Sequence, residues 1–275
     1  MEQTLTPAFK APSVSERLKS MLGVDFYRLF HTPLFYIMLA ISAIIPAMVL
    51  SMGGMAGPDG TAAPLYTNTW NIIAADVPLY IVRDIGDYAN MNMVFIFGGI
   101  LVSIFIGHDY RSGYVKQLFT THAKKRDYMM SKSIVCAFAM ACMCGCYLIA
   151  GEGAGLITGA SMSVNFGSLL IAILGKVIMS LGWASLYTFV NVVLRRHFGI
   201  SIALSFFIGT GIPIIGAAAL IGNNSLLNLF LYGSSVNACL SGNLLTLATC
   251  AAVSVSWAIV YNVLGSVVLA RSDVY

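Results

Sequence analysis

Few side chains in the sequence belong to the types that carry chemistry, and they lie far apart. His108 and Asp109 form one adjacent acid–base pair, but polar residues are common where an apolar run ends. Cys142, Cys144 and Cys146 alternate along an apolar run, and this spacing points successive thiols to different sides of a helix. We therefore expect no catalytic residue and no metal-binding residue in this chain.

Lys176 is the charged residue that stands deepest within a long apolar run. A lysine in lipid costs several kcal/mol, so its ammonium group should face protein, water or the headgroups. One interpretation places it on a translocation path or beside Glu152. The other lets its long side chain reach outward to the membrane surface, and the sequence leaves both open.

Nucleotide-hydrolysis and hydrolase motifs are missing from the sequence. It contains no GxxxxGK[ST] phosphate loop, no GxSxG elbow and no HExxH pair. We therefore expect that the chain is not an enzyme and binds no cofactor of its own.

The composition indicates a membrane protein. Of the 275 residues, 58% are hydrophobic and only 9% are charged, whereas a soluble domain carries about 25% charge. The apolar runs are continuous rather than alternating, which favours helices over a barrel. Six runs reach the roughly 17–25 residues that a spanning helix needs, and the fourth and sixth are longer; they cover 34–52, 91–107, 133–151, 167–194, 198–222 and 244–270. We expect an all-α protein with six spans in one transmembrane domain over 33–275.

The basic residues predict the orientation of these spans. Thirteen of the fifteen fall on one side: Lys10, Arg17, Lys19, Arg28, Arg111, Lys116, Lys124, Lys125, Arg126, Lys132, Arg195, Arg196 and Arg271. The positive-inside rule makes this side cytoplasmic, together with both chain termini. The charges are divided among membrane-edge segments, so we expect a lipid membrane as partner and no nucleic acid. A multi-pass protein of a cell membrane is predicted.

Two further segments lie outside the predicted spans. Residues 1–14 show little pattern and are expected to form a flexible tail. Over 15–32, Leu18, Leu22, Phe26 and Leu29 recur at helical spacing, which predicts an amphipathic helix on the inner membrane face, with basic groups near the headgroups; a cytoplasmic extension of the first span is the alternative.

The outer loop over 53–90 carries four aspartates and one arginine. We interpret it as an ordinary solvated loop, although a cationic substrate could also be drawn to it.

The inner loop over 108–132 carries the most specific pattern in the sequence. A span ends in an acidic residue, followed by a glycine, a basic residue, a hydrophobic pair and a later arginine, at Asp109, Gly113, Lys116, Leu118 with Phe119, and Arg126. This order resembles the permease subunits of type-2 ATP-binding-cassette (ABC) exporters, of the compact six-span kind found in peptide or lantibiotic export and immunity systems. The segment before Pro33 is similar to that family's amphipathic helix.

The resemblance implies a division of labour. A separate soluble ABC ATPase would use ATP and Mg²⁺, and a second permease copy or a paralogue would complete a dimer. The residues of the inner-loop pattern would couple the ATPase to the spans, with Val115, Leu118 and Phe119 available to dock and basic side chains at the rim. The substrate would be amphipathic, for instance an antimicrobial peptide, in a bacterial plasma membrane. The alternative function is an ATP-independent channel or secondary transporter.

Overall fold

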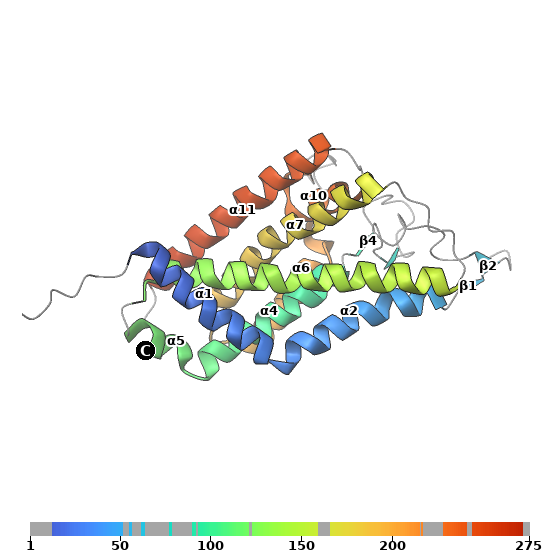
Figure 1. Cartoon of the computed structure of the whole chain (residues 1–275). Coiled ribbons are helices and arrows are strands. Elements are labelled where there is room, and N and C mark those ends of the chain that lie inside the picture. Colours follow the sequence, from blue (N-terminus) through green and yellow to red (C-terminus); the bar gives the residue numbers. More distant parts are fainter. Residues whose placement is uncertain are drawn as a thin grey trace, which may run out of the picture.

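The computed structural model describes residues 13–51, 55–56, 62–63, 77–78, 90–91, 93–120, 123–158, 166–214, 216, 228–240 and 244–271. Helices account for nearly all of them, and together they form an elongated bundle (Figure 1). The predicted helical fold is therefore confirmed for the described residues. The predicted tail, up to residue 12, lies outside them.

The chain enters the bundle through two helices that meet at a sharp corner. Helix α1 (Val14–His31) begins at a capping box, in which Ser13 and Glu16 satisfy each other's free backbone N–H groups. Helix α2 (Pro33–Ser51) begins with a proline, which suits a first helical position. The axes bend by 64° between them. The helix predicted over 15–32 is thus present, while its position on the membrane stays a prediction.

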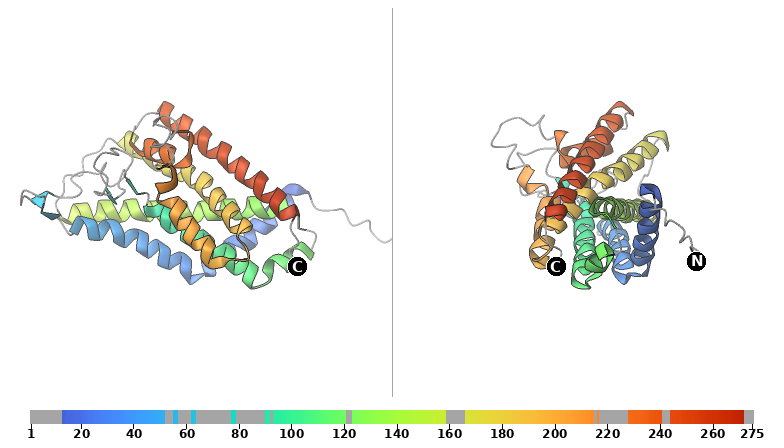
Figure 2. Two further views of the ribbon diagram at one scale, coloured as in Figure 1. Left: turned by 180° about the vertical axis from the view of Figure 1, so that it is seen from behind. Right: turned by 90° about the vertical axis from the view of Figure 1, so that its left-hand side faces the viewer.

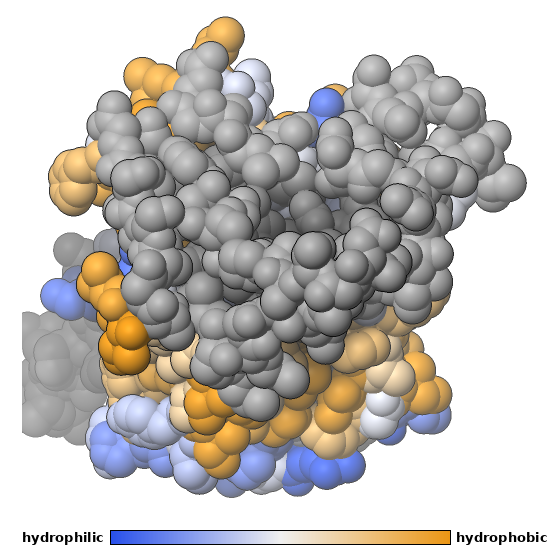
Figure 3. Space-filling model, turned by 90° about the vertical axis from the view of Figure 1, so that its right-hand side faces the viewer, coloured by the Kyte–Doolittle hydropathy of each residue, from blue (hydrophilic) through white to orange (hydrophobic). Residues whose placement is uncertain are grey.

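Four described helices are long and apolar enough to cross a bilayer. They are α4 (Met93–Arg111), α6 (Lys125–Thr158), α7 (Phe166–Val193) and α11 (Leu244–Arg271). The bent α1–α2 pair makes a fifth candidate if it is counted as one span. Figure 3 shows an apolar belt above a hydrophilic lower rim, as expected for a surface that faces lipid and then water.

The span predicted over 198–222 is not one continuous helix. Helix α8 (Phe198–Gly209) stops after 12 residues, and Gly211 follows with a positive φ of 70°. A side chain at Gly211 would collide with the ring of Tyr232, at the start of α10 (Leu231–Leu240). The count of six spans therefore stays a prediction.

Most of the predicted outer loop lies outside the described residues. Two antiparallel pairs of two-residue strands are described there: β1 (Met55–Ala56) with β2 (Ala62–Ala63), and β3 (Val77–Pro78) with β4 (Asn90–Met91). The four loop aspartates are not among the described residues. The proposed attraction of a cationic substrate stays a prediction for the same reason.

Helix α6 is the central element of the bundle, since α1, α2, α4, α7 and α11 all pack against it. Figures 1 and 2 show it crossed by α1 on one side. Aromatic rings fill the space between α4 and α7: Phe95 stacks on Trp183 with centroids 5.5 Å apart, and the tilted rings of Trp183 and Tyr187 have centroids 5.6 Å apart. Buried Asn191 donates to Ser103 at 3.0 Å, which ties the same two helices together by a polar bond.

Helices α7 and α11 approach closely at Gly182. The Ser254 hydroxyl of α11 donates to the carbonyl of Ile178 at 2.8 Å and accepts from the Gly182 N–H at 3.1 Å. A methyl group at Gly182 would lie only 2.5 Å from Leu231 and 2.8 Å from the Ser254 oxygen. Small residues such as this glycine allow the backbones of membrane helices to approach each other closely.

Gly182→Ala should lower the free energy of unfolding by about 1–3 kcal/mol, because the added methyl group forces the two helices apart. Thermal unfolding of the purified protein in detergent measures the effect. Gly145→Ala is the matched control, since a methyl group there meets nothing within 4 Å. Equal stability of the two variants would contradict this account of the α7–α11 contact.

Candidate functional site

Four charged side chains meet in the interior at one end of the bundle. The Lys132 ammonium lies 2.6 Å from an Asp25 oxygen and 2.6 Å from an Asp109 oxygen, and Arg28 reaches the other Asp109 oxygen at 2.5 Å. Asp25, Asp109 and Lys132 are at most 1% exposed. These four residues are called the buried charge cluster, and their formal charges sum to zero.

Three helices supply the cluster. Asp25 and Arg28 stand one turn apart on α1, Asp109 is near the end of α4, and Lys132 is in the second turn of α6. The Ser131 hydroxyl donates to the second Asp25 oxygen at 2.7 Å. Buried charges stabilise a structure only where their hydrogen-bonding capacity is met. Here each carboxylate is bound by at least two side chains: Asp25 by Ser131 and Lys132, and Asp109 by Arg28 and Lys132.

The cluster also contacts the short helix α5 (Tyr114–Thr120). The Arg28 guanidinium carbon lies 4.1 Å from the ring centroid of Tyr114, and Lys132 lies 5.5 Å from it. Burial, followed by the nearby Asp25 carboxylate, raises the pKa of the Tyr114 phenol, so the ring stays neutral at physiological pH. The contact is therefore a cation–π interaction rather than an ion pair.

Helix α5 is fixed to the bundle along one side. Gly113 makes the turn between α4 and α5 with a φ of 73°, a conformation that favours glycine. Val115 is 1% exposed and packs inward. The prediction that it is available for docking is therefore wrong. Leu118 and Phe119 are partly buried, and the Phe119 ring lies 5.8 Å from that of Tyr128 on α6.

Lys116 is the member of the predicted coupling set on the exposed side of α5. Its position leaves it accessible to a partner protein, whereas Asp109 is completely buried within the cluster.

Two predicted residues lie apart from the cluster. Arg126 is exposed and lines a groove between α6 and α11. Lys176 is 6% exposed and lies 5.7 Å from the ring centroid of Phe95, so its side chain faces protein rather than lipid.

The arginines of α1 do not extend toward the surface as the sequence suggested. Arg28 pairs with Asp109, and Arg17 lies 3.0 Å from Asp127 of α6. Both therefore fasten α1 to the bundle instead of pointing freely to headgroups.

The joining of Asp25, Arg28 and Lys132 into one unit was not predicted from the sequence. A signal was present, because Asp25 falls on the same helical face as Leu22 and Leu29. A carboxylate on a packing face needs a buried cation partner. Nothing in the sequence says that the partner stands 107 residues later.

The arrangement is suited to mechanical linkage rather than to catalysis. Each carboxylate is bound by cations, and no group of metal-ligating residues occurs among the described parts of the chain. A displacement of α1 must be shared by α4 and α6, because separating these three helices would leave buried charges unpaired. Helix α5 joins this linkage through the contacts of Tyr114 with Arg28 and Lys132.

Lys132→Met should lower the free energy of unfolding by about 3–5 kcal/mol, because two buried carboxylates lose their shared cation. Adding Asp25→Asn should restore part of the loss by removing one uncompensated charge. Thermal unfolding in detergent measures both variants, with the exposed Lys116→Met as control. Strictly additive losses in the double variant would show that the two residues are not coupled.

Comparison with known proteins is consistent with this architecture. A search of curated protein sequences finds no match to the chain. The family model described as ABC-2 family transporter protein matches residues 22–212, more than half of the chain, including the whole buried charge cluster and α5. The chain therefore belongs to the ABC-2 transporter family, and it is a multi-pass membrane permease of an ABC transporter.

Proposed function

We propose that this permease is the membrane subunit of an ATP-driven exporter, in which α5 receives the movement of a separate ATPase subunit. The family assignment implies an ABC ATPase as partner. ATP and Mg²⁺ would be used in that subunit, and this chain would bind no cofactor itself. Coupling would pass from α5 through the buried charge cluster to α4 and α6.

One observation carries this proposal: α5 has an exposed side and a firmly held side. Lys116 is exposed, whereas Val115 is buried and Tyr114 contacts Arg28 of the cluster. A motor can transmit displacement only through a contact that does not yield when it is pushed. The inward anchoring of α5 supplies that stiffness, and Gly113 allows it to lie across the end of α4.

The substrate that we propose is an amphipathic molecule, with antimicrobial peptides such as lantibiotics as the first candidates. A second permease copy or a paralogue would complete the translocation unit, and the substrate would cross or be extracted along their interface, in a bacterial plasma membrane. Lys176 stays the candidate residue of the translocation path, since it is a cation within the predicted span whose side chain faces protein rather than lipid. The support is the family resemblance of the inner loop.

Lys116→Glu should reduce ATPase copurification and transport by at least tenfold at unchanged expression in the membrane, because charge reversal at an interface repels its partner. Affinity purification in mild detergent and a transport assay provide the measurements. Arg196→Glu is the control, as an exposed cation on the predicted cytoplasmic side outside α5. Full ATPase binding and transport in the Lys116 variant would refute the docking role of α5.

An amphipathic cationic peptide should stimulate the ATPase activity of the purified permease–ATPase complex, since a transported substrate favours the conformations that hydrolyse ATP. Phosphate release is measured with the peptide and with a scrambled, non-amphipathic sequence of the same composition. Stimulation by neither peptide would remove this substrate class. Transport that continues without an ATPase would instead support a channel or secondary transporter.

A further inference from the structure

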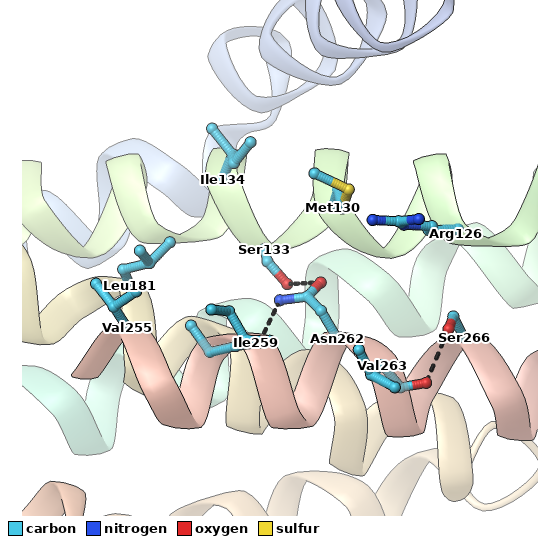
Figure 4. A pocket seen from close by; sticks show the side chains of 11 residues that line it. Arg126, Met130, Ser133, Ile134, Leu181, Val255, Ile259, Asn262, Val263 and Ser266 are labelled. Carbon is cyan, nitrogen blue, oxygen red and sulfur yellow. Dashed lines mark hydrogen bonds between the residues drawn. The ribbon is translucent and has the colours of Figure 1, made fainter. Parts of the chain in front are cut away.

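A groove of about 240 Å³ opens on the side of the bundle between α6, α7 and α11 (Figure 4). Its walls are apolar, with Ile134 from α6, Leu181 from α7, and Val255, Ile259 and Val263 from α11. The three α11 residues are 43%, 60% and 55% exposed. A surface of this kind within a membrane must be covered by lipid chains or by another protein.

The polar groups inside the groove are already satisfied. The Ser133 hydroxyl donates to the side-chain oxygen of Asn262 at 3.0 Å, and the Asn262 amide donates to Ser185 at 3.1 Å. Figure 4 shows the Ser133–Asn262 bond across the floor between α6 and α11. The floor therefore needs no polar ligand and can lie against an acyl chain.

The basic end of the groove has the opposite character. Arg126 lines it, and no described carboxylate forms an ion pair with Arg126, in contrast to Arg17, Arg28 and Lys132. The lining residues include no aspartate or glutamate. Lys125 donates to the carbonyl of Ala270 at 3.4 Å, which closes this end where α6 begins and α11 finishes. An anion would find a cation there without a competing carboxylate from the described part of the chain.

The dimensions suit one leaflet of a bilayer. From Val255 to Ser266 the groove follows α11 for about 16 Å by helical rise. Half of a hydrocarbon core is about 15 Å thick. The volume is below the roughly 300–1,000 Å³ of sites that enclose a whole small molecule. A single acyl chain that lies along α11 with its headgroup at Arg126 matches both measures.

We propose that this groove binds one anionic phospholipid from the membrane leaflet nearest to Arg126. One acyl chain lies along α11, and the phosphate lies on Arg126. Basic pockets between membrane helices on the cytoplasmic side are suited to such headgroups. A second permease copy fits less well, because a two-fold interface centred here would bring two Arg126 side chains together without a carboxylate. The proposal does not depend on the coupling role of α5.

The test uses the full chain in nanodiscs with equal parts of phosphatidylglycerol and phosphatidylcholine. After transfer to detergent, native mass spectrometry counts the lipids that stay bound. The unmodified chain should retain phosphatidylglycerol preferentially. Arg126→Gln should lower that retention about fivefold without changing retention of phosphatidylcholine. Val263→Trp should lower retention of both lipids by filling the groove. Because Val263 is exposed, the larger side chain should not disturb folding.

Arg196→Gln and Val267→Trp are matched controls, since both residues are exposed and neither lines the groove. Retention of phosphatidylglycerol that is equal in the unmodified, Arg126→Gln and Val263→Trp chains would overturn the proposal. Cross-linking of two copies through Ile259→Cys in native membranes, without cross-linking through Val267→Cys, would also overturn the proposal, because a second copy would then cover the groove.

Discussion

The enclosure of the Lys132 ammonium between Asp25 and Asp109 is the constraint on which the basic end of the bundle depends. An ammonium group in an apolar interior loses its hydration, and only nearby carboxylates at hydrogen-bonding distance compensate for that loss. The two carboxylates come from α1 and α4, while the lysine comes from α6. Arg28 then balances the remaining negative charge, so no one helix can shift without leaving a charge unpaired.

The proposed coupling role gives this cluster a task within a transport cycle. An ABC permease must convert events in a soluble subunit into movements within the membrane. Apolar packing slides easily, whereas ion pairs at 2.6 Å have fixed partners and weaken sharply when they separate. Tyr114 extends this linkage to α5 through its contacts with both cations.

Much of the fold could be predicted from the sequence because the bilayer imposes a length on apolar helices. The bounds of α2 and α7 agree with the predicted runs within two residues. Helix α6 begins eight residues earlier and ends seven later than predicted, since its first turns carry charges that hydropathy excludes and its last turns contain glycines that suggest a loop. The end of α8 depends on the backbone at Gly211 and on Tyr232, and a distant packing partner is invisible to a local pattern.

The candidate site was predictable only in part for a related reason. The inner-loop pattern located Asp109 and the residues of α5, but Lys132 counted only as a marker of topology, and Asp25 was given no role. Pairing between them is a property of the folded chain, since a helix-period pattern identifies a face and not the residue that will meet it. The same limit applies to Arg126, whose groove exists only because α6 and α11 lie together.

The unbroken course of α6 has a consequence for how the two faces of the membrane communicate. Its 34 residues extend for about 50 Å, well beyond a hydrocarbon core of about 30 Å. A rigid rod of that length acts as a lever. A tilt of roughly 5° at one tip moves the opposite tip by about 4 Å, given the helical rise. A pivot at the first turn of α6, together with its partners in the cluster, would thus turn a small movement at Lys132 into a larger one at the far end of the helix.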